Sequence, residues 1–425
     1  MIRCIKSLSV VVLVLSSYAH AASVGKSENS DKGALKTGLQ LDVTVGLGYD
    51  SNIYRAPSDA YINYADPCNI NTEPNCVVGV NDKTYKYIEP SIQSGTLIPA
   101  ELNLDFIKGI SEQNYLVTSY KFDGELYTDS AYDNANNYAH KIRLGDEYVF
   151  DNVGRKTHSI YVGGLLEHKK RLYLDRDTGE EQTSSGGLDV SNRYTYDAIG
   201  VEAEYKNRIS EIQYNIDLKF SERDYEDPVA VSQYDHTYFL LGGDVKYQIA
   251  KPTKLTLGYK YYTYDYDERP SRNEDGRLTT NRQPNPPREY EYNKFDITLR
   301  HRINNAWLTY LDYERKTRTD KYVGYDNYTK DLFKVRVHYE INKNNKIKLS
   351  YAYWERDYPN AFAFDNREVG IAKQYDGTDL NVSATTKLDK NKAIVVDFEY
   401  VDENTTDLRY DYDRYRAFVS FQWEY

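Results

Sequence analysis

Basic side chains recur at alternate positions in the second half of the chain, with apolar residues between them. Lys334 and Arg336, for example, alternate with Val335 and Val337. Successive side chains of an extended strand point to opposite faces, so one face of this segment would be positive and the other apolar. A positive face that lines a channel would attract an anionic solute or a sugar polymer. The candidate lining residues are Arg300, Arg302, Lys330, Lys334, Arg336, Lys348, Arg356, Arg414 and Arg416.

The same pattern has a second interpretation. Acidic residues also lie on the polar faces of the strands, namely Asp217, Asp379, Asp397 and Glu399. If they paired with the basic residues, the lining would be neutral and would have no role in selecting a solute. The sequence leaves both interpretations open.

Catalytic chemistry has less support in the sequence. None of the six histidines after residue 21 lies in a Ser–His or Asp–His pattern that resembles barrel lipases, deacylases or proteases. These histidines are His140, His158, His168, His236, His301 and His338. The segment 175–181 contains D-x-D-x-G but lacks the remaining ligands of a calcium loop. We therefore expect no enzymatic activity, no metal site and no cofactor.

Cys68 and Cys76 lie close together in a polar stretch that contains Pro67 and Pro74. In an oxidising compartment such a pair predicts a local disulfide within a loop. A metal site would need further ligands nearby, and the stretch has none. Two free thiols are the remaining alternative.

The first residues are typical of a secretory signal. Arg3 and Lys6 precede an apolar run from Leu8 to Leu15, and a small-x-small pattern ends at Ala21. We expect a signal peptide over 1–21, a flexible periplasmic leader over 22–38 and a single domain over 39–425. Removal of the signal changes the net charge from −11 to −13. We expect no nucleic-acid partner for this acidic chain.

A period of two in hydrophobicity persists from residue 38 to the last residue, and the links between the alternating segments are short and long in strict turn. Short periplasmic turns that alternate with long extracellular loops are typical of outer-membrane barrels, whereas β-sandwiches mix their connections less regularly. The sequence predicts an all-β fold, a transmembrane antiparallel up-and-down barrel of about sixteen strands in the bacterial outer membrane. The predicted strands are 38–50, 84–95, 113–126, 138–150, 157–168, 193–205, 210–222, 234–248, 254–264, 290–302, 306–316, 328–341, 346–356, 376–387, 393–401 and 411–425.

The stretch 96–112 is the weakest part of this assignment. Leu102, Leu104 and Phe106 alternate briefly before Gly109. The stretch fits a longer second strand, a periplasmic excursion, or an extra hairpin that would raise the count to about eighteen.

Tyrosine is unusually abundant, with 45 residues against a single methionine. Its ring tolerates lipid and its hydroxyl reaches water, so we expect tyrosines in a girdle at the membrane interface. The chain also ends on an aromatic strand, in which Val419, Phe421, Trp423 and Tyr425 share one face. This ending resembles the signal that the barrel-assembly machinery reads on outer-membrane proteins.

The opening strand and its exit read Val45-Gly-Leu-Gly-Tyr-Asp-Ser-Asn-Ile-Tyr-Arg55. This segment resembles the Gly-x-Gly-Tyr-Asp-x-Asn strand end with which the β-barrel porin 2 family begins. The resemblance implies a channel for exopolysaccharide export, with periplasmic polysaccharide-export components as partners beside membrane lipid and lipopolysaccharide. A general diffusion porin, or a structural or adhesive barrel acting through its loops, are the alternatives.

The predicted facing of the strands can be tested by substitution. Replacing Lys334, Arg336 and Lys348 together with glutamine should leave the barrel folded and shift conductance in planar bilayers toward cations. Replacing Val335 and Val337 with arginine should instead impair assembly, because a charge at the bilayer midplane costs about 2–4 kcal/mol. A glutamine variant that fails to assemble beside an arginine variant that inserts would show that the facing is inverted.

Overall fold

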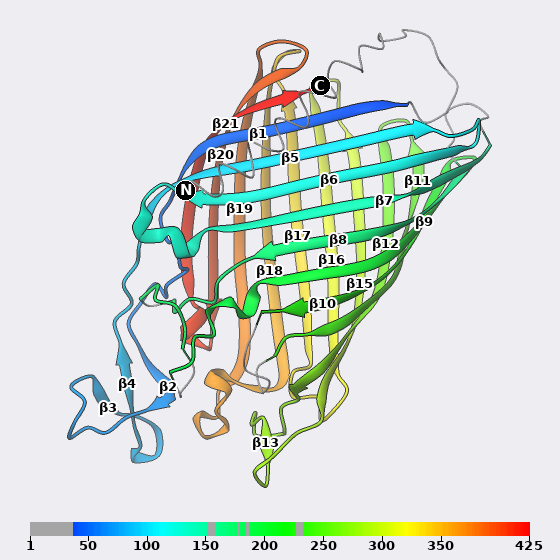
Figure 1. Ribbon diagram of the computed structural model, residues 1–425. Helices are drawn as coiled ribbons and strands as arrows, with labels where there is room; N and C mark the ends of the chain where they lie inside the picture. Colours follow the sequence, from blue (N-terminus) through cyan, green and yellow to red (C-terminus); the bar gives the residue numbers. More distant parts are fainter. Residues whose placement is uncertain (1–36, 152–157, 177, 184–186, 227–232) are drawn as a thin grey trace.

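The structure is a computed structural model that describes residues 37–151, 158–176, 178–183, 187–226 and 233–425. Sixteen described strands pair antiparallel and close into one barrel in the order β1-β21-β20-β19-β18-β17-β16-β15-β12-β11-β10-β9-β8-β7-β6-β5 (Figure 1). The predicted up-and-down barrel is therefore confirmed. Its strands are β1 (Gly38–Asp50), β5 (Gly95–Gly109), β6 (Asn114–Tyr127), β7 (Asn137–Asp151), β8 (His158–Lys170), β9 (Tyr196–Ile209), β10 (Ile212–Tyr225), β11 (His236–Ala250), β12 (Thr253–Pro270), β15 (Pro287–Arg302), β16 (Trp307–Asp320), β17 (Tyr328–Glu340), β18 (Asn345–Phe362), β19 (Ala372–Lys387), β20 (Lys392–Thr405) and β21 (Tyr412–Glu424).

The two ends of the barrel differ in the length of their connections. At one end short turns join neighbouring strands, as at 210–211 and 251–252, and at the other end lie long loops such as 51–94. Figure 1 shows these long loops projecting together beyond one rim of the barrel. Short periplasmic turns and long extracellular loops give the barrel its orientation. The predicted signal peptide and most of the predicted leader lie outside the described residues.

The outer face of the barrel is apolar. Leu47, Phe333 and Val419 keep 59%, 58% and 56% of their surface exposed, and each alternates with polar residues. In a closed barrel every backbone group of the wall finds a partner in a neighbouring strand, which permits such a surface to lie in lipid. The barrel spans the bacterial outer membrane.

No helix in the described residues combines the length and the apolar character needed to cross a membrane.

The inner face is identified by contacts that cross over intervening strands. Arg416 on β21 donates to Glu125 on β6 at 2.6 Å, although β1 and β5 lie between these strands. Arg143 on β7 pairs with Glu202 on β9 across β8. Side chains reach over a strand in this way only on the concave side of the wall. Positions with the parity of Arg416 along β21 therefore face the lumen.

The second barrel strand differs from the prediction. It is β5 (Gly95–Gly109), whereas 84–88 forms β4 in a three-stranded sheet of the first loop. The alternation of β5 is hard to recognise because apolar Leu97 lies on its inner face and Pro99 interrupts it. Leu97 is fully buried inside the barrel against Tyr127 and Phe418. The strand count stays at sixteen, so the extra hairpin does not form.

The first extracellular loop carries a small sheet of its own, in the order β2-β4-β3, which projects from the rim (Figure 1). Its strands are β2 (Tyr61–Pro67), β3 (Cys76–Val78) and β4 (Thr84–Ile88), with η1 (Val80–Asp82) between the last two. A disulfide joins Cys68 and Cys76. The bridge closes the connection between β2 and β3 and thereby limits the freedom of the loop.

The barrel closes where β1 meets β21, and a buried ion pair lies at the extracellular end of this seam. Asp50 is fully buried and accepts from Arg414 Nε at 2.8 Å and from the Tyr127 hydroxyl at 2.6 Å. Gly48 stands one inward position earlier, where a Cβ atom would collide with the Phe418 ring. The Gly-x-Gly-Tyr-Asp ending of the opening strand thus fits the packing of the seam.

The other end of the seam is held by the chain terminus. Leu41 and Tyr425 exchange two backbone hydrogen bonds of 3.0 and 2.8 Å. The aromatic face of the last strand points outward, with Val419, Phe421, Trp423 and Tyr425 exposed by 37–56%.

Loss of the Asp50 carboxylate should destabilise the seam. Asp50→Ala leaves the buried Arg414 without a partner, which costs about 3–5 kcal/mol. We expect the folded, fast-migrating gel band of the variant to convert to the unfolded band at a clearly lower temperature than that of the wild type. Asp59→Ala, at an exposed loop position, is the control. Equal conversion temperatures for Asp50→Ala and the control would show that the ion pair does not secure the seam.

Candidate functional site

The nine basic residues predicted to line the lumen all lie on the inner face, but three of them are neutralised. Arg336 forms two hydrogen bonds of 2.8 Å with Asp312 on the neighbouring strand. Arg414 pairs with Asp50, and Arg416 pairs with both Glu125 and Glu399. These three residues follow the ion-paired interpretation and add little net charge to the lumen.

The other six have no ion pair within the described part of the chain. Lys330 lies over the Trp354 ring at 3.9 Å, and Arg356 lies over the Tyr375 ring at 4.2 Å. Arg302, at the periplasmic end of β15, donates to the Asn305 carbonyl. The remaining three are Arg300, Lys334 and Lys348.

A row of tyrosine rings, linked at one point through the His236 ring, lines the extracellular half of the inner wall. The rings of Tyr262 and Tyr292 stack at 4.5 Å with 9° between their planes, and the neighbouring rings follow at 4.9–6.4 Å. We call this row the tyrosine belt. It comprises Tyr196, Tyr225, Tyr238, Tyr262, Tyr264, Tyr290, Tyr292, Tyr328, Tyr358 and Tyr375, on strands from β9 to β19.

Cationic side chains lie on top of the tyrosine belt. Lys316 Nζ is 4.9 Å from the centre of the Tyr292 ring, and the Arg223 guanidinium is 5.1 Å from the centre of the Tyr238 ring. Lys219 lies over the same Tyr238 ring at 5.5 Å. None of these three cations forms an ion pair with a described carboxylate.

The rings hold these cations without cancelling their charge. A cation is attracted to the negative face of an aromatic ring, but the ring carries no net charge. A carboxylate in the same place would remove the field that a solute in the lumen experiences. We call Lys219, Arg223, Lys316, Lys330 and Arg356 the ring-supported cations. They give part of the lumen a positive surface although the whole chain carries −11 charges.

The position of the tyrosine belt corrects the expectation that the tyrosines form a girdle at the membrane interface. Tyr238, Tyr292 and Tyr328 are buried inside the barrel at 9%, 5% and 8% exposure and do not face lipid. Other tyrosines, such as Tyr49 and Tyr415, do lie on the outer face. Composition could not separate the two sets, because a tyrosine suits either face. Their shared parity with the basic residues, as at Tyr290, Tyr292 and Arg300, was the available signal.

The long loops are tied together over the extracellular rim by buried charges. Asp407 is fully buried and accepts two hydrogen bonds of 2.8 Å from Arg409 of η7 (Leu408–Tyr410) and one from the Phe364 amide of η5 (Ala363–Asp365). Burial alone would raise the pKa of Asp407, but the bonds and charges of Arg409 and Lys373 lower it below its ordinary value of 3.8. In the loop after β16, Arg288 and Arg318 likewise lower the pKa of Asp326 against the effect of burial.

Several solved structures are similar to the chain in overall form. OmpT of Vibrio cholerae is 10% identical with a TM-score of 0.43, over 92% of this chain and 99% of that one. An anion-selective porin from Comamonas acidovorans is 9% identical with a TM-score of 0.44, over 92% and 99%. OmpF of Salmonella typhi in complex with daunomycin is 11% identical with a TM-score of 0.47, over 92% and 98%.

These similarities are too distant to support an argument about function. No known family's sequence profile matches the chain, and no curated protein matches it. The resemblance of residues 45–55 to the β-barrel porin 2 family therefore stays a prediction. The chain is a porin-like barrel on the strength of its own sixteen paired strands.

Acid should loosen the loops that Asp407 joins. Because its folded-state pKa is lowered, Asp407 adds stability that is complete above pH 3.8 and is lost as the pH falls through the lower folded value. We expect pepsin to cleave the loops 363–371 and 406–411 of the wild type at pH 2.5 but not at pH 4.5. Asp407→Asn should already be cleaved at pH 4.5, and Asp389→Asn, in an exposed periplasmic turn, should behave as the wild type. Resistance of Asp407→Asn at pH 4.5 would contradict the role of this carboxylate.

Proposed function

We propose that the protein is a non-enzymatic outer-membrane channel that prefers anionic solutes, and that its cargo is an acidic exopolysaccharide leaving the cell. The observation that carries the proposal is the set of ring-supported cations on the inner wall. None of these cations forms a direct ion pair with a described carboxylate, and they lie in a barrel of a size that leaves an aqueous lumen.

A saccharide polymer also suits the chemistry of this wall. Tyrosine hydroxyls and ring edges offer hydrogen bonds and apolar contact, which sugars use together, while the cations attract acidic groups. Tyr262, Tyr264 and Tyr358 of the belt are only partly buried, so they can contact a chain in the lumen. The resemblance of the opening strand to the β-barrel porin 2 family points the same way. Under this proposal periplasmic export components would deliver the polymer, and the barrel-assembly machinery would insert the barrel.

A general diffusion porin for small anions is the second candidate. A closed barrel of sixteen strands is the size of known diffusion porins, and positive charge on its wall would suit small anions as well as polymers. The two candidates differ in cargo rather than in charge preference.

Charge preference can be measured in planar bilayers under a potassium chloride gradient. The reversal potential of the wild type should show a preference for chloride. Replacing Lys219, Arg223, Lys316 and Arg356 with glutamine should move it toward zero or toward potassium, because charges inside the lumen act on ions at close range. The matched control replaces Lys251, Arg277, Arg282 and Lys343, which are exposed in the connections, with glutamine and should change it little. A wild-type channel that prefers potassium would contradict the proposal.

The cargo can be tested in the organism. A deletion strain should secrete less acidic exopolysaccharide and retain polymer in the periplasm, and the wild-type gene should restore secretion where the quadruple glutamine variant does so poorly. Normal secretion combined with poor uptake of a small anionic nutrient would reject the export cargo and favour the diffusion porin.

A further inference from the structure

A cavity of about 580 Å³ lies inside the extracellular mouth of the barrel. Its wall includes Glu125 of β6, Lys169 of β8 and Arg414 of β21, which are all on the inner face, so the cavity is part of the lumen. Loop residues that fold inward supply most of the remaining lining, including 53–55, 134–135, 171–176 and 409–410. Its volume lies in the range of about 300–1,000 Å³ that is usual for sites of small ligands.

The first of these segments is held inside by the motif that resembles the β-barrel porin 2 family. Asn52 is buried and bonds both the amide and the carbonyl of Ala56, at 2.8 and 2.9 Å, and the Asp413 carbonyl at 3.1 Å. Ile53 packs against Leu97 and Phe418 of the inner wall. This tight elbow fixes Arg55 at the edge of the cavity.

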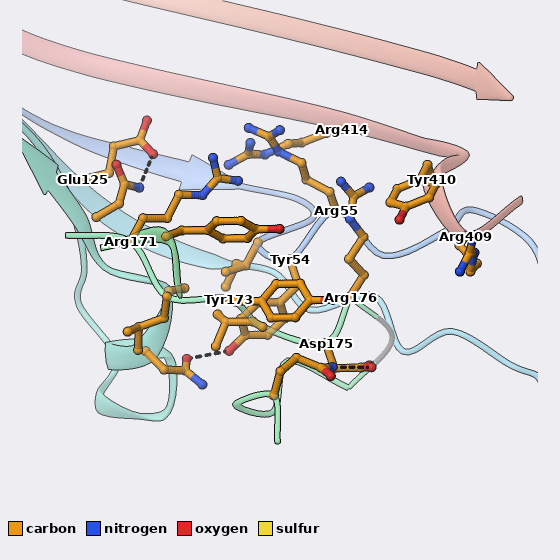
Figure 2. A pocket seen from close by; sticks show the side chains of 18 of the residues that line it. Tyr54, Arg55, Glu125, Arg171, Tyr173, Asp175, Arg176, Arg409, Tyr410 and Arg414 are labelled. Atoms are coloured by element: carbon orange, nitrogen blue, oxygen red, sulfur yellow. Dashed lines mark hydrogen bonds between the residues drawn. The ribbon is translucent and has the colours of Figure 1, made fainter. Parts of the chain in front are cut away.

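Five arginines surround the cavity (Figure 2), and two of them are neutralised. Arg414 pairs with Asp50, and Arg409 pairs with Asp407. The other three, Arg55, Arg171 and Arg176, form no ion pair with any described carboxylate.

The three unpaired arginines are placed by aromatic rings, as the ring-supported cations are. Arg176 lies 4.8 Å from the centre of the Tyr410 ring, Arg55 lies 5.9 Å from that of Tyr412, and Arg171 lies 5.9 Å from that of Tyr194. The Nη1 atom of Arg176 is buried and has no hydrogen-bond partner in the described protein. A buried donor without a partner is costly, and a bound acceptor would relieve that cost.

The positive charges around the cavity lie close enough together to affect the pKa of Arg55. Burial, together with the charges of Arg414, Arg171 and Arg176, lowers the pKa of Arg55. Asp175 lies in the same cavity, but it accepts hydrogen bonds of 2.9 Å from the Thr178 amide and from Gln182.

We propose that Arg55, Arg171 and Arg176 form an oxyanion-binding site at the extracellular mouth, which holds an acidic group of a saccharide as it passes. The proposal rests on the proposed function for its ligand class and assigns a place of recognition separate from the tyrosine belt. Guanidinium groups bind carboxylate, sulfate and phosphate oxygens through paired N–H donors. Three guanidinium groups facing one cavity offer more donors than a single passing chloride ion needs.

Isothermal titration of the full-length protein in detergent tests the site. The probes are trigalacturonate, inorganic phosphate and the neutral maltotriose. We expect the wild type to bind trigalacturonate and not maltotriose, and a variant with Arg55, Arg171 and Arg176 all replaced by glutamine to bind it at least about tenfold more weakly. Trigalacturonate binding more tightly than phosphate would assign the site to saccharide carboxylates, whereas phosphate binding as tightly would assign it to phosphorylated ligands.

The matched control replaces Arg208, Arg277 and Arg282, which are exposed and lie outside the cavity, with glutamine. It removes the same charge and should keep wild-type affinity. Removing mutually repelling charges should not unfold the barrel, and the single variant Arg176→Gln provides a second test if the triple variant fails to fold. Equal affinity for trigalacturonate in the wild type and the cavity variants, or an equal loss in the control, would overturn the site.

The site and the proposed function can fail separately. A chloride-preferring channel whose trigalacturonate affinity does not depend on the three arginines retains its function and has no such site. A channel without anion preference that nevertheless loses trigalacturonate binding in the triple variant has the site but a different function.

Discussion

The structure depends on the pairing of its first and last strands. Until β1 and β21 join, each presents a row of unpaired backbone groups that lipid cannot satisfy. The register places Val43 opposite Trp423 and Asp50 opposite Arg416. The buried Asp50–Arg414 pair fixes the extracellular end of this seam, and the exchange between Leu41 and Tyr425 fixes the periplasmic end. Closure of the barrel then determines which side chains face lipid and which face water.

This division explains how an acidic chain can carry a set of cations along its lumen. Lipid accepts few charges on the outer face, so the charged residues of the wall concentrate on the inside or at the rims. On the inner face, the nearest partner of each cation determines whether its charge is neutralised. Arg336 meets Asp312 and is neutralised, whereas Lys316 meets Tyr292 and keeps its charge. The tyrosines that seemed suited to the membrane interface thus act as supports for lumen charge. The extracellular mouth shows the same arrangement, in which arginines of the loops lie over tyrosine rings.

The sequence predicted the parts of the fold that follow from alternation. The faces of β17 and β18 were predicted correctly because Val335 and Leu349 alternate with charged residues over a full strand. The second barrel strand was placed too early, at 84–95, because the packing of Leu97 against Phe418 puts an apolar residue on the inner face of β5. Such packing involves residues far apart in the chain. The pairing of Arg414 with Asp50, 364 positions apart, was hidden for the same reason. The cluster of Arg55, Arg171 and Arg176 could not be predicted, because alternation says nothing about loops that fold inward.

Under the proposed function, this lumen recognises acidic saccharides through cations held on aromatic rings. Interruption of the current through single channels in planar bilayers by oligosaccharides tests it most directly. Oligogalacturonates added on the periplasmic side should interrupt the current for times that lengthen with the number of carboxylates and shorten at high salt. Neutral maltooligosaccharides of equal length should pass or be excluded without such interruptions. Equal interruption by both series, or by neither, would contradict the account.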